Sequence, residues 1–230
     1  MISQAWAVLA GLDPKRSVQA MNSAWQLLAD DKTGTIKLLA PPFTGKDIDP
    51  GYIAAYPPGV RENGAQYTHA ACWMLVALAQ MGDADRAHRA LEMLLPVNHA
   101  LSREDVQRYR VEPYVMAADV YTAGEHAGRG GWTWYTGSAA WMLTGILKLL
   151  GYERRGNRVR MHALLGKWPQ ARVEIRWGGS TYCLVSQADA EYVSLDGAQI
   201  RDEWILMTDD GRKHCAVFPA RKPNTAMQYI

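Results

Sequence analysis

Cysteine is scarce in this chain. Its 230 residues include only Cys72, Cys183 and Cys215, which are widely spaced. Such a sparse and odd set argues against a disulfide framework or a zinc site and predicts a reducing, cytoplasmic environment. The N-terminal residues carry no positively charged stretch and no small-residue cleavage site, so no secretory signal is predicted.

Excess charge and long apolar runs are missing as well. The 25 Lys and Arg residues nearly balance the 23 Asp and Glu residues, which gives a formal net charge of +2. Without a basic run interleaved with aromatics, we do not expect nucleic-acid binding. The longest apolar stretches, such as residues 139–150, are too short and too broken to span a bilayer. The histidines show no ligand spacing, so no metal site is predicted.

Among the aromatic residues, phenylalanine is rare. Two Phe stand against nine Trp and eleven Tyr. Trp and Tyr combine a flat apolar face with a polar group, which suits sugar rings that stack and form hydrogen bonds. Core filling explains any single Trp more simply, so this balance favours a carbohydrate site only together with polar motifs.

Helical patterns fill the first two thirds of the chain. Asp13-Pro14 and Ser102 with Asp105 are typical of helix starts, and Gly82 of a helix end. We predict helices over residues 3–10, 14–28, 67–81, 84–95, 112–121 and 139–150, with a short one after Ser102. The helix over residues 3–10 is apolar almost all round, which predicts that its outer face has either lost its cover or is covered by a partner.

Short β-rich segments follow Gly151. Gly, Asp or Asn turns separate them, and they span residues 172–177, 181–186, 192–195, 200–207 and 214–218. The predicted fold is mainly α with a β tail. A helical part covers residues 1–150, and a small antiparallel β domain covers residues 151–230.

The segment 57–69 is the first candidate site. Its polar side chains are those of Arg61, Glu62, Asn63, Gln66, Thr68 and His69. They lie where a loop meets a helix, and helix N-termini offer free N–H groups and a positive dipole end to an anion. His69 is placed to contact a phosphate. Alternatively, the asparagine and the threonine cap the helix and His69 is a half-buried structural residue.

The Gly-rich segment 128–139 is the second candidate site. Thr136 and Ser138 offer hydroxyl groups, and with Gly137 they offer backbone N–H groups ahead of a helix, which could bind an oxyanion. Trp132 and Trp134 could stack on sugar. The alternative is a tight turn with aromatic filling. The segment matches neither a P-loop nor a dinucleotide fingerprint.

Glu112 and Asp119 form a weaker candidate. On the predicted helix they share one face, as an acid/base pair flanking a glycosidic bond would. Neutralisation of Arg61 or Arg129 by Glu112, or helix capping, is the simpler interpretation.

Three motifs carry a family resemblance: PPGVRENGAQYTHAA, YRVEPYVMAADVY and GRGGWTWYTGSAAWM. They resemble glycoside hydrolase family 94. The most similar branches are the phosphorylase-like domain at the C-terminus of cyclic β-1,2-glucan synthases and the β-1,2-oligoglucan phosphorylases, while cellobiose and chitobiose phosphorylases are more distant. The resemblance runs over residues 2–210.

The resemblance implies an (α/α)6 barrel, of which this chain would form the C-terminal half, followed by a small β domain. It also implies inverting phosphorolysis, in which phosphate attacks the anomeric carbon while an acid protonates the leaving oxygen. Inorganic phosphate is then a co-substrate, and no other cofactor is expected. His69 and the pair Thr136-Gly137 match the family's phosphate-holding positions.

Further binding residues are predicted from the chemistry of their side chains rather than from the family match. Ser138 is expected to help hold phosphate. The substrate-binding candidates are Arg61, Glu62, Gln66, Glu112, Trp132 and Trp134.

The resemblance implies no catalytic residue in this chain, because the family's general-acid Asp lies upstream of the stretch that resembles residues 2–11. We therefore expect the C-terminal part of a β-glucan phosphorylase, with β-1,2-glucan as substrate. An upstream chain from a split gene, or self-association over the open half-barrel, would complete it. The alternatives are a non-catalytic carbohydrate-binding remnant and a complete glycosidase that uses Glu112 and Asp119. The resemblance also allows membrane attachment of a full-length relative.

Overall fold

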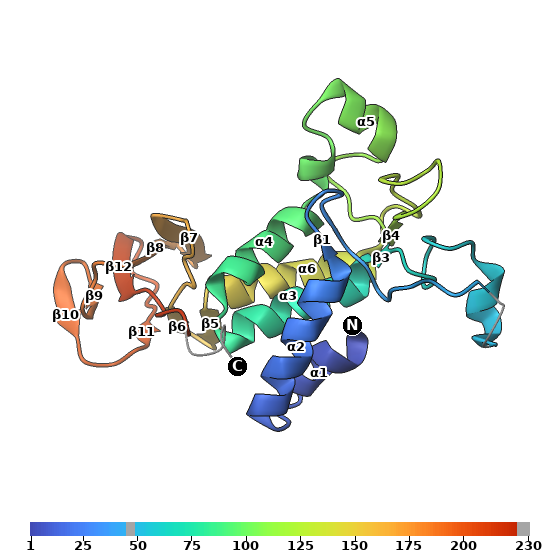
Figure 1. The fold of residues 1–230 in the computed structure, drawn as a ribbon. Coiled ribbons are helices and arrows are strands. Elements are labelled where there is room, and N and C mark those ends of the chain that lie inside the picture. Colours follow the sequence, from blue (N-terminus) through green and yellow to red (C-terminus); the bar gives the residue numbers. More distant parts are fainter. Residues whose placement is uncertain (45–48, 225–230) are drawn as a thin grey trace.

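The computed structural model describes residues 1–44 and 49–224, and in them a helical part is followed by a β part (Figure 1). The described α-helices are α1 (Ile2–Leu9), α2 (Pro14–Leu28), α3 (Thr68–Met81), α4 (Ala84–Leu94), α5 (Arg103–Tyr109) and α6 (Thr136–Leu149). Two 3-10 helices, η1 (Gly51–Ala55) and η2 (Pro96–His99), lie in the connections.

Local sequence sets several helix ends. The Asp13 carboxylate accepts a hydrogen bond from the backbone N–H of Arg16 at 2.8 Å, at the start of α2. Ser102 caps α5 in the same way. Gly82 ends α3 with a left-handed backbone, φ 80°, which glycine adopts without a steric penalty. Helix α6 begins earlier than predicted, at Thr136.

The predicted helix over residues 112–121 is wrong. Only a turn forms after Glu112, and the chain then extends into β4 (Asp119–Val120). The N–H of Ala118 donates to the carbonyl of Trp132 at 2.6 Å, and β4 pairs with β3 (Gln66–Tyr67). Hydrogen bonds to distant segments therefore outweigh the local helical pattern.

The β part contains two sheets. One has the strand order β10-β9-β12-β8-β7 and the other β11-β6-β5. The strands are β5 (Tyr152–Arg155), β6 (Arg158–Met161), β7 (Gln170–Trp177), β8 (Ser180–Gln187), β9 (Val193–Leu195), β10 (Ala198–Ile200), β11 (Ile205–Leu206) and β12 (Lys213–Pro219), and the helical part adds β1 (Ala29–Asp30) and β2 (Thr35–Ile36).

Three strand predictions need correction. The β part is not wholly antiparallel, because β12 runs parallel to β8. A parallel neighbour needs a long crossover, and the chain between Gln187 and Lys213 supplies it. The predicted strand over residues 200–207 is two strands in two different sheets. The hairpin of β5 and β6 was not predicted, since its arginines hide the apolar alternation.

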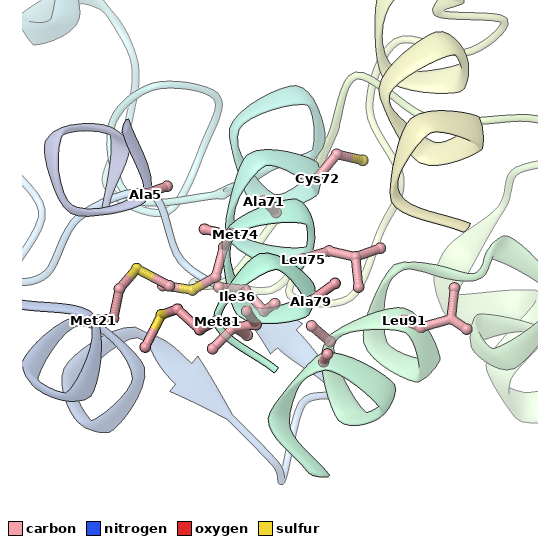
Figure 2. Close-up of a cluster of buried hydrophobic side chains, with 14 of the residues drawn as sticks. Ala5, Met21, Ile36, Ala71, Cys72, Met74, Leu75, Ala79, Met81 and Leu91 are labelled. Atoms are coloured by element: carbon pink, nitrogen blue, oxygen red, sulfur yellow. The ribbon is translucent and has the colours of Figure 1, made fainter. Parts of the chain in front are cut away.

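Helix α3 lies at the centre of the helical core. It is buried on nearly every side, as expected for a helix that is apolar all round. Figure 2 shows Ala5 from α1, Met21 from α2 and Ile36 from β2 beside Met74 and other side chains of α3. The site residues at the start of α3 are therefore held by the best-packed element of the molecule.

The β part contacts the helices through packing and hydrogen bonds. Trp168 packs against both hydrophobic cores, and the His88 ring meets it edge-on at 4.3 Å. The carbonyl of Leu164 lies 2.7 Å from His88 Nε2. After β12, the guanidinium of Arg221 donates to the carbonyl of Ala79 at 3.0 Å and to a neighbouring carbonyl at the end of α3.

Helix α1 leaves apolar surface uncovered. Ala5 and Val8 are buried, whereas Ile2 and Trp6 are 42% and 41% exposed. In residues 1–44 and 49–224, none of the helices combines the length and apolar character needed to cross a membrane.

Candidate functional site

The two candidate segments meet at β4. On one side, β4 pairs with β3, with Gln66 opposite Val120 and Tyr67 opposite Asp119. On the other side, Val120 forms an antiparallel bridge with Gly130. Segments that are far apart in the sequence are thus hydrogen-bonded through one short strand, which is what a shared site requires.

A tight turn presents Arg61. Gly59 precedes it with φ 83°, and a Cβ at Gly59 would lie 2.5 Å from the Cβ of Ala123, so only glycine fits. Arg61 itself has φ 48°. Its backbone N–H donates to Asp119 Oδ2 at 2.9 Å, which holds this uncommon conformation in place.

Helices α3 and α6 run side by side in the same direction. The side chains of Tyr67 and Tyr135, which precede the two helices, lie close together, and burial followed by the neighbouring Tyr135 raises the pKa of Tyr67 to about 12. Further along, a Cβ at Gly145 would lie 2.6 Å from Leu75. Both helix N-termini therefore lie together, and their free N–H groups and positive dipole ends favour an anion there.

His69 lies in the first turn of α3 and faces α6. A Cβ at Gly137 would lie 3.4 Å from His69 Nδ1, and the Trp73 ring centroid lies 4.8 Å from that of His69. Burial lowers the pKa of His69, which favours the neutral ring with one donor and one acceptor nitrogen. Nε2 is buried and has no hydrogen-bond partner among the described residues.

The predicted residues 136–138 form the first turn of α6 rather than a loop ahead of it. Thr136 is exposed, while Ser138 is fully buried and its Oγ has no hydrogen-bond partner in the described part of the chain. The first N–H groups of a helix have no partner within the helix. This turn therefore offers backbone donors toward His69.

Arg61 and the two predicted tryptophans, Trp132 and Trp134, are together called the open rim of the candidate site. The Arg61 guanidinium carbon lies 5.4 Å from the ring centroid of Trp132, which is 67% exposed. Trp134 is 65% exposed, and its Nε1 donates to Glu112 Oε1 at 3.5 Å. Exposed flat rings beside a guanidinium and a carboxylate can contact the faces and the hydroxyls of a sugar.

Two other predicted residues point inward. Gln66 is buried, and its Oε1 accepts a hydrogen bond from the N–H of Ile36 at 2.8 Å, so this oxygen is used by the fold. Glu62 is half-buried, and its Oε2 has no hydrogen-bond partner among the described residues. The sugar-binding roles of both residues stay predictions.

Asp119 has a structural position that the sequence did not reveal. It is buried next to Gly131, where a Cβ would meet Asp119 Oδ1 at 2.1 Å. Burial raises its pKa, against the opposing hydrogen bond from Arg61. Since Asp119 is on a strand and Glu112 is exposed in a turn, the expected pair on one helix face is wrong.

A hollow of about 750 Å³ lies elsewhere, between the β1–β2 turn, α4 and α5. Its arginines are engaged by carboxylates: Arg89 with Asp31 at 2.7 Å and Arg108 with Asp105 at 3.3 Å. Of the two candidate segments, only Gly128 is among the residues that line it. Within residues 1–44 and 49–224, no group of three or more His, Cys, Asp or Glu side chains could hold a metal ion.

Known proteins are similar in sequence to this chain. A family model described as the catalytic domain of the glycosyl hydrolase 94 superfamily matches residues 1–151. Cyclic beta-(1,2)-glucan synthase NdvB of Rhizobium meliloti (strain 1021) is 47% identical over 193 residues, which are 83% of this chain and 7% of that protein.

Phosphorylases are among the relatives too. Solabiose phosphorylase of Paenibacillus borealis is 27% identical over 222 residues, 92% of this chain and 28% of that protein. N,N'-diacetylchitobiose phosphorylase of Vibrio proteolyticus is 28% identical over 210 residues, 86% of this chain and 26% of that protein. The chain thus spans less than a third of the length of these relatives.

Proposed function

The chain belongs to the glycosyl hydrolase 94 superfamily, and from this we propose that it is the phosphate- and sugar-binding part of an inverting β-glucan phosphorylase. The observation that carries the proposal is the meeting of two helix N-termini beside His69. Free backbone donors and two dipole ends around a neutral imidazole suit the binding of an oxyanion.

In the proposed reaction, phosphate binds to the first turn of α6. Thr136, Gly137 and Ser138 donate through backbone N–H groups and hydroxyls, and His69 donates from one ring nitrogen. One phosphate oxygen then attacks the anomeric carbon from the face opposite the leaving oxygen. Because phosphate is already an anion, no base is needed to activate it. An acid protonates the leaving oxygen, and the products are α-glucose 1-phosphate and a shortened glucan.

The sugar would lie on the open rim. Trp132 and Trp134 offer ring faces, while Arg61, Glu62 and Glu112 offer charged groups for hydroxyls, and Gln66 supports the segment that carries them. The similarity to a cyclic beta-(1,2)-glucan synthase favours β-1,2-glucan as the substrate.

We further propose that residues 1–150 form half of an (α/α)6 barrel and residues 151–230 a separate β domain. The general acid would be supplied by a partner chain that carries the first half of the barrel, whereas a second copy of this chain could cover the open face but would bring no such acid. The exposed Ile2 and Trp6 of α1 support an uncovered face at this position.

Binding can be tested on the chain itself by calorimetry with inorganic phosphate and, separately, with sophorose-type oligosaccharides. Replacing His69 with Ala removes one hydrogen bond to a charged ligand and should weaken phosphate binding by about 10- to 150-fold. His126→Ala is the matched control, since His126 is 57% exposed in a loop. Equal phosphate affinity of both variants would contradict the assignment of His69.

Sugar binding needs its own variant. Trp134→Ala should weaken oligosaccharide binding and leave phosphate binding unchanged, because the exposed ring lies on the rim. Trp204→Ala, in the β part, is the control and should change neither. If Trp134→Ala leaves oligosaccharide affinity intact, the rim is not the sugar site.

Turnover is tested by mixing the chain with a chain that carries the first half of the barrel, β-1,2-glucan and phosphate, and measuring α-glucose 1-phosphate. Product that depends on His69 supports the phosphorylase. Phosphate and glucan binding without product in any pairing would instead assign a non-catalytic carbohydrate-binding function.

A further inference from the structure

Two of the three cysteines lie opposite each other on neighbouring strands. Strand β12 runs parallel to β8 with Cys215 in register with Cys183. The next pair along, Ala216 and Leu184, is fully buried. Because side chains alternate between the two faces of a sheet, both cysteines point to the outer face.

Their spacing suits a disulfide. Neighbouring strands lie about 4.7–4.9 Å apart, which is within the range of about 4.4–6.8 Å found between the Cα atoms of disulfide-bonded cysteines. Both Cβ atoms leave the same face of the sheet, and both cysteines are free. A bond between them therefore needs no change of register.

The outer face is open to a reagent. A hollow of about 590 Å³ is lined by both cysteines, with Arg172 and Lys213 beside them. The nearest carboxylate in this lining, that of Asp196, already accepts hydrogen bonds from a histidine ring and from the backbone N–H of Cys215. The guanidinium of Arg172 pairs loosely with Glu174 at 3.9 Å, and with Lys213 it gives this hollow a positive charge that would attract an anionic reagent.

We propose that Cys183 and Cys215 form a dithiol that a small anionic disulfide of the glutathione type converts into an intrachain disulfide. This inference is independent of the proposed phosphorylase function.

The exchange takes place in two steps. The thiolate of Cys215 attacks one sulfur of the reagent, which forms a mixed disulfide and releases one thiolate. The thiolate of Cys183 then attacks Sγ of Cys215, which forms the intrachain bond and releases the second thiolate. The two cysteine protons end on the two released thiols. The protein is oxidised by two electrons, and the reagent is reduced by two.

Cys215 is the first nucleophile because it is exposed, while Cys183 is half-buried. Burial of its sulfur, followed by the neighbouring Cys183 thiol, raises the pKa of Cys215. The reaction is therefore expected to be slow at neutral pH and faster at pH values above the usual thiol range. Cys72 is an internal control, because burial raises its pKa to about 12 and no reagent reaches it.

The test treats the folded chain with glutathione disulfide at alkaline pH, followed by blocking of free thiols and peptide mapping by mass spectrometry. The expected product is a linked pair of peptides that contain Cys183 and Cys215, with Cys72 blocked only after unfolding. The intact mass falls by the mass of two hydrogen atoms, and a reductant reverses it.

Variants separate the steps. Cys183→Ser should stop at a stable mixed disulfide on Cys215, and Cys72→Ser should behave like the unmodified chain. A persistent mixed disulfide on Cys215 in the unmodified chain, or free thiols at both positions at equilibrium, would overturn the proposal. Both of these outcomes are measured on the unmodified folded chain and do not depend on how the variants fold.

Discussion

Replacing Gly137 with Ala is predicted to weaken phosphate binding without harming the fold. Gly137 is in the first turn of α6 and is not among the glycines with positive φ. A Cβ there would have His69 Nδ1 as its nearest neighbour, at 3.4 Å, which is an ordinary van der Waals contact. The new methyl group therefore fits the free protein but occupies space between the two helix starts.

The magnitude follows from these contacts. Alanine is favoured over glycine in a helix by up to about 1 kcal/mol, so the free energy of unfolding should stay level or rise. Displacing phosphate from one backbone N–H should cost about 1.5–3 kcal/mol, which corresponds to about a 10- to 150-fold loss of affinity.

Gly145→Ala is the matched control in the same helix. Its Cβ would lie 2.6 Å from the Cδ2 atom of the buried Leu75, so the Leu75 side chain or the helices must shift. Overpacking of this kind lowers the free energy of unfolding by about 1–3 kcal/mol, and the higher helix propensity of alanine offsets up to about 1 kcal/mol of this loss. Gly145→Ala should thus lower the free energy of unfolding, with a smaller effect on phosphate affinity than Gly137→Ala.

Calorimetry with phosphate and urea unfolding of both variants give the two quantities. The reasoning is refuted if Gly137→Ala binds phosphate as tightly as the unmodified chain while remaining folded. It is also refuted if Gly137→Ala is the less stable of the two variants.

Two further predictions concern stability. Gln66→Ala removes the acceptor for the buried N–H of Ile36 and should lower the free energy of unfolding by about 1–3 kcal/mol, which urea unfolding measures; an unchanged midpoint would mean that this hydrogen bond is dispensable. Hydrogen bonds to Asp196 and then Asp210 raise the pKa of His214 above 6.5. The protonated ring therefore adds to the free energy of unfolding in full below pH 6.5, and this contribution is lost as the pH rises through the raised pKa. His214→Gln should therefore be less stable than the unmodified chain at pH 6 and should lose less stability between about pH 6 and 8.5; parallel pH profiles of the urea midpoint for the two proteins would contradict this.

Local sequence determined the helices that carry their own start and end signals. Asp13, Ser102 and Gly82 form caps within a few residues of themselves, so no distant partner is needed. The same holds for the strands on either side of Gly178-Gly179, which pair directly across a tight turn. The family resemblance also came from contiguous motifs, and the family match over residues 1–151 confirms it.

Sequence alone failed where a segment takes its structure from a distant partner. Residues 112–121 have a helical pattern, but the carbonyl of Trp132 and strand β3 draw them into an extended form. Strand β12 pairs in parallel with β8 because a long crossover returns it there. The alternation along either strand gives no hint of its neighbour.

The candidate site shows the same division. The sequence by itself indicated the residue types, the two candidate segments and a helix over residues 67–81 with His69 near its start. Only the tertiary structure decided that α3 and α6 begin side by side. It also decided that Asp119 accepts a hydrogen bond from the backbone N–H of Arg61, and that the Gln66 side chain accepts one from the N–H of Ile36. These relations join residues more than twenty positions apart, and such contacts depend on how the whole chain packs rather than on any local pattern.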